Sequence, residues 1–84
     1  MSPTINRVLF VDDDEAMRSA NAQTLELAGF EPVLAASAMD AIARLEGGFD
    51  GIVVSDIRMP GMDGLQLFAA IRAIDPDLPV ILIT

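Results

Sequence analysis

Three short, unbroken runs of apolar residues constrain the fold of this chain more than any other feature. They lie at residues 8–11, 52–54 and 80–83, and polar or turn-forming residues flank each of them. A strand that is apolar along its whole length is typically buried on both faces, as in a parallel sheet with helices on either side. The runs therefore predict three strands, at residues 5–11, 51–55 and 79–84.

The segments between these runs show the residue spacing of helices. Apolar and small residues recur there three and four positions apart, as on one face of an amphipathic helix. In the first segment, Met17, Ala20, Thr24, Leu27 and Ala28 recur at this helical spacing. Gly29 then takes the position of a C-terminal cap, and Ser37 and Asp40 predict a capping box at the second helix. The patterns predict helices at 15–28, 38–46 and 64–74, and a weaker strand at 32–36.

Strands and helices therefore alternate along the whole chain. This order predicts an α/β fold with a doubly wound parallel sheet, formed by a single domain over residues 1–84. The sequence stops in the fourth strand, and an apolar strand at the edge of a sheet invites pairing with another chain. We therefore expect residues 1–84 to be a partial domain, completed by further elements or by a partner.

The absence of cysteine and histidine narrows the available chemistry. Without them the chain has no disulfides, no thiolate or imidazole metal ligands, and no serine–histidine or cysteine–histidine nucleophile. The net charge of -8, from 13 acidic and 5 basic residues, opposes nucleic acid binding by this segment. The apolar runs are far shorter than the about 20 residues of a membrane span, and the N-terminus does not look like a signal peptide. A soluble cytoplasmic protein is predicted, with neither nucleic acid nor membrane as a direct partner.

Acidic and hydroxyl side chains stand at the ends of the predicted strands. They are Asp12, Asp13 and Asp14 after the first strand, Asp56 after the third and Thr84 at the end of the fourth. The carboxyl ends of parallel strands meet at one edge, where open α/β sheets bind their ligands. Clustered carboxylates repel one another or recruit a cation, and an all-oxygen site favours Mg²⁺ over Ca²⁺. A carboxylate beside such an ion can attack phosphorus and form an aspartyl phosphate.

A structural role is the alternative for several of these acids. Aspartate is a preferred helix N-cap, so Asp13 or Asp14 could cap the first helix and Asp63 the third. For any one aspartate both roles stay open. The coincidence of acids at the ends of the first and third strands favours a shared site.

Three stretches resemble the receiver domains of bacterial two-component response regulators. They are Val-Leu-Phe-Val-Asp-Asp-Asp-Glu at 8–15, Ser-Asp-Ile-Arg-Met-Pro-Gly-Met-Asp-Gly at 55–64 and Pro-Val-Ile-Leu-Ile-Thr at 79–84. The middle stretch is highly specific, and the resemblance covers the whole chain. The separations also match, with 43 residues from Asp13 to Asp56 and 28 from Asp56 to Thr84.

The resemblance implies a role for each site residue. Asp56 matches the phosphorylated aspartate, and Thr84 matches the switch hydroxyl that turns toward the phosphoryl group. Asp13 matches the direct Mg²⁺ ligand, and Asp12 matches its companion acid, which acts through a metal-bound water. Arg58 matches the position whose backbone carbonyl completes the metal site. A sensor histidine kinase is the implied phosphoryl donor.

The resemblance also implies the topology, a flavodoxin-like fold with strand order 2-1-3-4. A complete receiver continues through another helix, a fifth strand and a final helix, and it carries an essential lysine at the end of the fifth strand. This sequence contains no lysine. The stretches at 55–64 and 79–84 look like those of receivers that precede AAA+ activators of σ54 transcription, which implies a transcriptional output.

Other functions stay open on the residues alone. Asp12 and Asp14 have the Asp-x-Asp spacing of haloacid-dehalogenase-type phosphatases, although Ala16 stands where that family places threonine or valine. The chain could instead be an assembly fragment that pairs or exchanges elements with a second copy through its last strand, as a homodimer. A Ca²⁺-binding loop is disfavoured, because residues 12–14 lack the alternating ligands and central glycine of an EF-hand.

Overall fold

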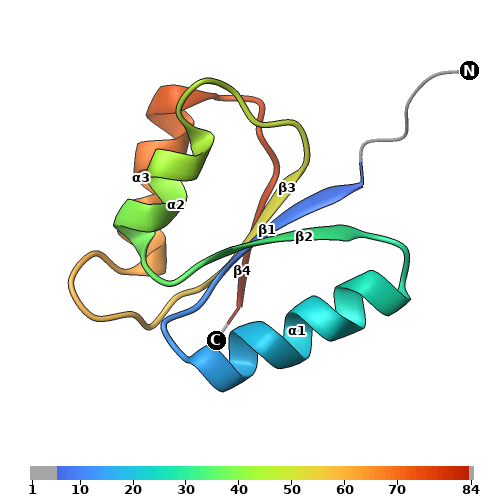
Figure 1. Ribbon diagram of the computed structural model, residues 1–84. Helices are drawn as coiled ribbons and strands as arrows, with labels where there is room; N and C mark the ends of the chain where they lie inside the picture. Colours follow the sequence, from blue (N-terminus) through green and yellow to red (C-terminus); the bar gives the residue numbers. More distant parts are fainter. Residues whose placement is uncertain (1–5, 84) are drawn as a thin grey trace, which may run out of the picture.

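The computed structural model describes residues 6–83 as a four-stranded parallel sheet with helices on both faces (Figure 1). The elements are β1 (Arg7–Val11), α1 (Glu15–Leu27), β2 (Glu31–Ala35), α2 (Ala38–Leu45), β3 (Ile52–Asp56), α3 (Gly64–Ile74) and β4 (Val80–Ile83). The strands lie in the order β2-β1-β3-β4, and their pairs are parallel. The predicted α/β class and strand order are confirmed. Within residues 6–83, no helix has both the length and the apolar character needed to cross a membrane.

The predicted ends of the elements differ from the observed ones by no more than two residues. The strand β3 ends at Asp56 rather than at Ser55, so the acidic residue belongs to the strand. The strand β1 begins at Arg7. Ile5, the predicted start of that strand, and Thr84, the predicted end of the last one, lie outside the described residues.

Side-chain caps explain where two of the helices begin. The Asp14 carboxylate accepts the backbone N–H groups of Ala16 at 2.9 Å and Met17 at 3.2 Å, at the start of α1. Asp63 and Gln66 form a reciprocal capping box at the start of α3. The capping role predicted as an alternative for Asp14 and Asp63 is therefore confirmed.

The start of α2 departs from the predicted capping box. The Ser37 hydroxyl accepts the N–H of Asp40 at 3.1 Å, as predicted. The Asp40 carboxylate, however, accepts the N–H of Ala36 at 3.2 Å. In a reciprocal capping box, this carboxylate would accept the N–H of the N-cap residue Ser37 instead.

The helix α1 ends in a Schellman motif. The N–H of Gly29 donates to the Glu26 carbonyl at 3.1 Å, and the N–H of Phe30 donates to the Leu25 carbonyl at 2.9 Å. Gly29 has a φ of 91°, which glycine adopts without the strain that a Cβ would cause. The predicted place of Gly29 at the end of the helix is confirmed, with Ala28 as the cap itself.

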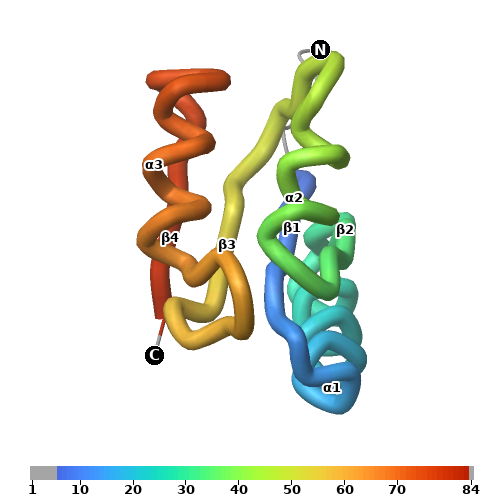
Figure 2. The backbone as a smooth tube through the Cα atoms, turned by 90° about the vertical axis from the view of Figure 1, so that its left-hand side faces the viewer, coloured from blue at the N-terminus to red at the C-terminus, as the bar shows by residue number. Residues whose placement is uncertain are grey.

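The face of the sheet that α2 and α3 cover holds the main core, and Figure 2 looks onto this side. Leu9, Val11 and Val53 of the strands and Leu67 and Ile71 of α3 are all 0% exposed. Burial of one such side chain stabilises the fold by about 1.5–3 kcal/mol. We call this side of the sheet the closed face.

The helix α1 covers only part of the opposite face, which we call the open face (Figure 1). It packs against β1 and β2, where Val8 and Phe10 are buried. At the far edge, Ile81 and Ile83 of β4 remain 52% and 39% exposed. The open face is therefore apolar but incompletely covered over β3 and β4.

The residues whose spacing predicted α1 do not form its inner face. All five are exposed, among them Leu27 at 85%. The half-buried residues of this helix are Arg18, Asn21, Ala22 and Leu25. They too have helical spacing, and they lie on the side of α1 that packs against β1 and β2. A polar side chain can bury its stem and keep its polar end bonded, so the apolar pattern alone indicated the wrong face.

Candidate functional site at the carboxyl end of the sheet

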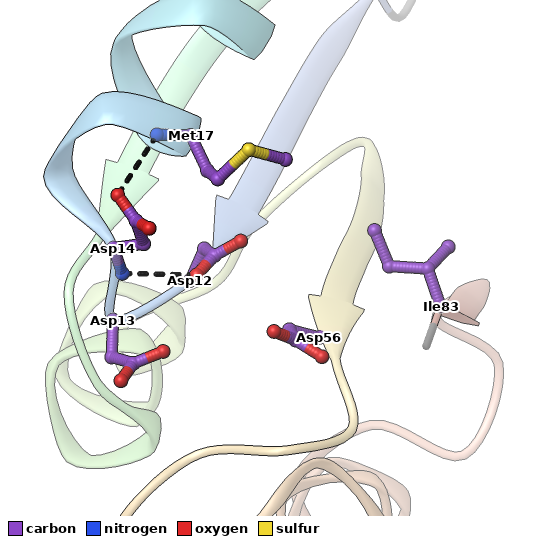
Figure 3. Close-up of a pocket in the computed structure, with 6 residues that line it drawn as sticks. All are labelled: Asp12, Asp13, Asp14, Met17, Asp56 and Ile83. Carbon is purple, nitrogen blue, oxygen red and sulfur yellow. Dashed lines mark hydrogen bonds between the residues drawn. The ribbon is translucent and has the colours of Figure 1, made fainter.

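Strand register brings two carboxylates side by side. The strands β1 and β3 pair with Val11 beside Ser55, so the next residues along, Asp12 and Asp56, follow in register. Side chains alternate along a strand, and both carboxylates therefore project to the open face. On its other side Asp56 is paired with Ile83 of β4 (Figure 3).

Asp12 is buried, with 4% of its surface exposed. Its backbone N–H donates to the Ala35 carbonyl at 3.1 Å and so extends the pairing of β1 with β2. Its carboxylate accepts the N–H of Asp14 at 2.9 Å, and its carbonyl oxygen accepts the Arg18 guanidinium at 2.8 Å. This acid is therefore held by the sheet, by the following turn and by α1.

Asp13 is exposed and lies in the turn between β1 and α1 (Figure 3). One carboxylate oxygen from each of Asp12, Asp13 and Asp56 lies within 4.8 Å of the other two. The open hollow that they share has a volume of about 340 Å³, and it is also lined by Asp14, Met17 and Ile83. Residues that are 43 positions apart in sequence thus contribute oxygens to one small volume.

The loop after β3 shapes the surroundings of Asp56. The carboxylate oxygen Oδ1 of Asp56 accepts the N–H of Arg58 at 3.1 Å, which orients the side chain. The chain returns at Gly64, whose N–H donates to the Ile57 carbonyl at 2.9 Å. A Cβ at Gly64 would lie 2.5 Å from the Asp56 carbonyl oxygen. Glycine therefore allows α3 to start this close to the end of β3.

The Asp14 carboxylate is engaged by the N-terminus of α1. It points to the helix amides rather than forming a catalytic pair with Asp12 (Figure 3). This contact argues against the phosphatase alternative, which needs both acids of the Asp-x-Asp spacing. Asp14 contributes to the shape of the hollow and to the start of the helix.

Sequence reasoning did not assign Met17, Ile83 or Arg18 to the site. The places of Met17 and Ile83 follow from connectivity, because a helix after a parallel strand begins at the carboxyl end of that strand and the neighbouring strand ends there too. Arg18 was missed because a charged residue does not fit the apolar pattern of an inner helix face. Thr84, the predicted switch hydroxyl, lies outside the described residues.

The donor set of the cluster suits a hard divalent cation. It consists of carboxylate oxygens, which Mg²⁺ prefers over nitrogen and sulfur ligands. Ligands on opposite sides of Mg²⁺ lie about 4.2 Å apart, and the oxygens of this cluster lie within 4.8 Å of one another. Three carboxylates alone repel a phosphoryl group, so a bound cation is what makes the site compatible with one.

The family model of the response regulator receiver domain matches residues 8–84. The chain is 61% identical over 77 residues to the C4-dicarboxylate transport transcriptional regulatory protein DctD of Rhizobium meliloti. That alignment covers 92% of this chain and 17% of DctD, so the chain spans less than a fifth of this relative.

Solved structures show the same likeness. The chemotaxis protein CheY4 of Vibrio cholerae matches with a TM-score of 0.88 and 30% identity, over 94% of this chain and 68% of that one. The response regulator TrrA of Thermotoga maritima, solved in complex with Mg²⁺ and BeF, matches with a TM-score of 0.87 and 32% identity, over 92% of this chain and 67% of that one. The chain belongs to the response regulator receiver domain family.

Proposed function

We propose that this chain is the phosphoacceptor part of a two-component response regulator, and that a sensor histidine kinase transfers a phosphoryl group to Asp56. The proposal is carried by one observation, the convergence of Asp12, Asp13 and Asp56 within 4.8 Å at the carboxyl end of the sheet. Receiver domains of response regulators interact with histidine kinases, and membership of the family supports this partner.

Phosphoryl transfer requires a positioned oxygen nucleophile and compensation of the phosphoryl charge. A carboxylate oxygen of Asp56 forms the new bond to phosphorus while the bond from phosphorus to the kinase histidine nitrogen breaks. The electron pair of that bond stays on the nitrogen. The hydrogen bond from Arg58 keeps the carboxylate oriented, and partial exposure of Asp56 leaves it accessible to a partner.

Mg²⁺, when bound, compensates the negative charge on the phosphoryl oxygens. We assign Asp13, Asp56 and the backbone carbonyl of Arg58 as its direct ligands. Asp12 would act on the ion through a water, and its bond to a backbone N–H supports this indirect role. We assign Thr84 as the hydroxyl that turns toward the phosphoryl group.

The wider setting of this module belongs to the same proposal. We place residues 1–84 in a partial receiver domain of a cytoplasmic response regulator with a transcriptional output. The likeness to DctD, a transcriptional regulatory protein, supports that output. The module signals rather than turning over a substrate, and its net charge of -8 supports the absence of direct nucleic acid contact.

Phosphate incorporation tests the assignment of Asp56. The intact parent protein that contains this chain, incubated with acetyl phosphate and Mg²⁺, should gain one acyl phosphate that is detected by intact-mass spectrometry. Asp56→Asn should abolish the gain, whereas Asp50→Asn, an exposed acid at the other end of the sheet, should retain it. Undiminished phosphorylation of the Asp56→Asn variant would refute the assignment.

The exposed edge of β4 favours a second proposal, assembly with another copy of the chain. Ile81 and Ile83 are 52% and 39% exposed there, and strand pairing or exchange of elements would cover them. In this case the chain is an interaction fragment that is not phosphorylated. Light scattering over a range of concentrations tests the proposal, since a monomer at every concentration rules it out and a dimer supports it.

A further inference from the structure

We propose, on the basis of the function proposed above, that Arg18 is a positioning residue for the metal site. Its guanidinium holds the peptide between Asp12 and Asp13 and thereby directs Asp13 into the acidic cluster. The contact that carries the proposal is the hydrogen bond from Arg18 Nη1 to the Asp12 carbonyl oxygen, 2.8 Å long and partly buried.

The arginines of this chain differ in what their guanidinium groups contact. Arg7 and Arg44 pair with exposed carboxylates. Arg72 donates to two backbone carbonyls at the amino end of the sheet. Arg18 occupies the inner side of α1 and donates to a residue of the acidic cluster. A charge placed in a half-buried position needs a hydrogen-bond partner, so the contact with Asp12 fixes where this side chain lies.

Asp13 depends on its neighbours for its orientation. It is exposed, and it stands between two peptide groups that are both held by hydrogen bonds. Arg18 fixes the preceding peptide through the Asp12 carbonyl, and the Asp12 carboxylate fixes the following one by accepting the N–H of Asp14 at 2.9 Å. With both peptide planes fixed, the backbone dihedrals of Asp13 are restricted and the direction of its Cα–Cβ bond toward the cluster is set.

The loss of Arg18 should change Mg²⁺ affinity in opposite directions, depending on whether Arg18 positions Asp13 or acts only through its charge. A positive charge near the cluster repels a cation, so its removal would tighten Mg²⁺ binding if charge were its only contribution. If Arg18 holds Asp13 in place, its removal weakens binding, by about tenfold as for other residues that orient metal ligands. The sign of the change therefore separates the two roles.

The test is the dissociation constant of Mg²⁺, measured by isothermal titration calorimetry on the full chain. Arg18→Met keeps an apolar stem and removes the donors, and we expect about tenfold weaker binding. Arg18→Lys keeps the charge and an ammonium group that can donate, but not the planar fork, and its affinity should lie between those of the wild type and Arg18→Met. The matched control is Arg72→Met, which removes a guanidinium that donates to the Leu78 carbonyl at 2.6 Å and should leave Mg²⁺ affinity unchanged.

Unchanged or tighter Mg²⁺ binding by Arg18→Met would overturn the proposal. Asp13→Asn, measured alongside, separates this failure from that of the proposed metal site, because wild-type affinity in Asp13→Asn overturns both. If circular dichroism shows that Arg18→Met does not fold, Arg18→Lys decides the question. An affinity below that of the wild type then supports the positioning role, and an equal affinity overturns it.

Discussion

The two ends of the parallel sheet both hold a hollow lined by acids, and they differ in how those acids are arranged. At the carboxyl end, oxygens of three aspartates lie within 4.8 Å of one another. At the amino end, a hollow of about 390 Å³ is lined by three other acids, Asp50, Asp75 and Asp77. Within residues 6–83, the carboxyl-end group alone is close enough to form a candidate metal cluster.

Two of the amino-end acids, Asp75 and Asp77, belong to the connection between α3 and β4, and Asp50 lies just before β3. The Asp75 carboxylate accepts the N–H of Asp77 at 3.0 Å, and Arg72 donates to the carbonyls of Asp75 and Leu78 at 3.3 Å and 2.6 Å. These bonds hold the turn together. The difference shows that acidic composition does not make a site, whereas parallel strands that end in register do.

Each end of the sheet has a glycine, Gly51 or Gly64, that leaves no room for a side chain. Substituting each of them perturbs one end of the sheet at a time. A Cβ at Gly51 would overlap the carbonyl oxygen of Arg7, and one at Gly64 would lie 2.5 Å from that of Asp56. We expect Gly51→Ala and Gly64→Ala each to lower the free energy of unfolding by about 1–3 kcal/mol, as overpacking does. Urea unfolding followed by circular dichroism measures this loss.

Only the Gly64→Ala change should also weaken Mg²⁺ binding, because only this clash displaces the end of β3 that carries Asp56. Calorimetric titration with Mg²⁺, at a temperature where both variants are folded, measures the two affinities. An equal loss of Mg²⁺ affinity in Gly51→Ala would show that the metal site is not confined to the carboxyl end.

A smaller effect on stability distinguishes the two possible roles of Asp14, as a helix cap or as a metal ligand. Asp14 caps α1, so Asp14→Ala should lower the free energy of unfolding by about 1 kcal/mol, and Asp14→Asn, which can still cap, should largely restore it. Thermal unfolding measures both. Equal stability of the two variants, together with an equal loss of Mg²⁺ binding, would make Asp14 a ligand instead.

Much of the fold and the placement of the acids could be predicted from the sequence. Apolar runs without alternation are typical of strands in a parallel sheet, although Ile81 and Ile83 of β4 stay exposed in residues 6–83. The ends of parallel strands coincide, and this places Asp12 beside Asp56. The rotation of α1 could not be predicted, because Arg18 and Asn21 turn to the sheet while Met17 is 48% exposed.

There is a physical reason why the rotation of α1 could not be predicted from the sequence. The helix carries two possible faces of similar spacing, and the one that packs against β1 and β2 is the more polar of the two. The bond from Arg18 to the Asp12 carbonyl follows from the rotation, so sequence patterns could not reveal it. Residues that support a site from a neighbouring helix are therefore harder to predict than the strand-end residues that form it.

The most direct test of a metal site at the carboxyl end of the sheet is to map the bound cation by NMR. Mn²⁺, a paramagnetic substitute for Mg²⁺, broadens the signals of backbone amides close to its site. Added in small amounts to the full chain, it should broaden the amides of residues 12–14 and 56–58 and spare those of 75–78, and excess Mg²⁺ should restore them. Equal broadening at both ends of the sheet, or broadening at 75–78 alone, would contradict a metal site at the carboxyl end.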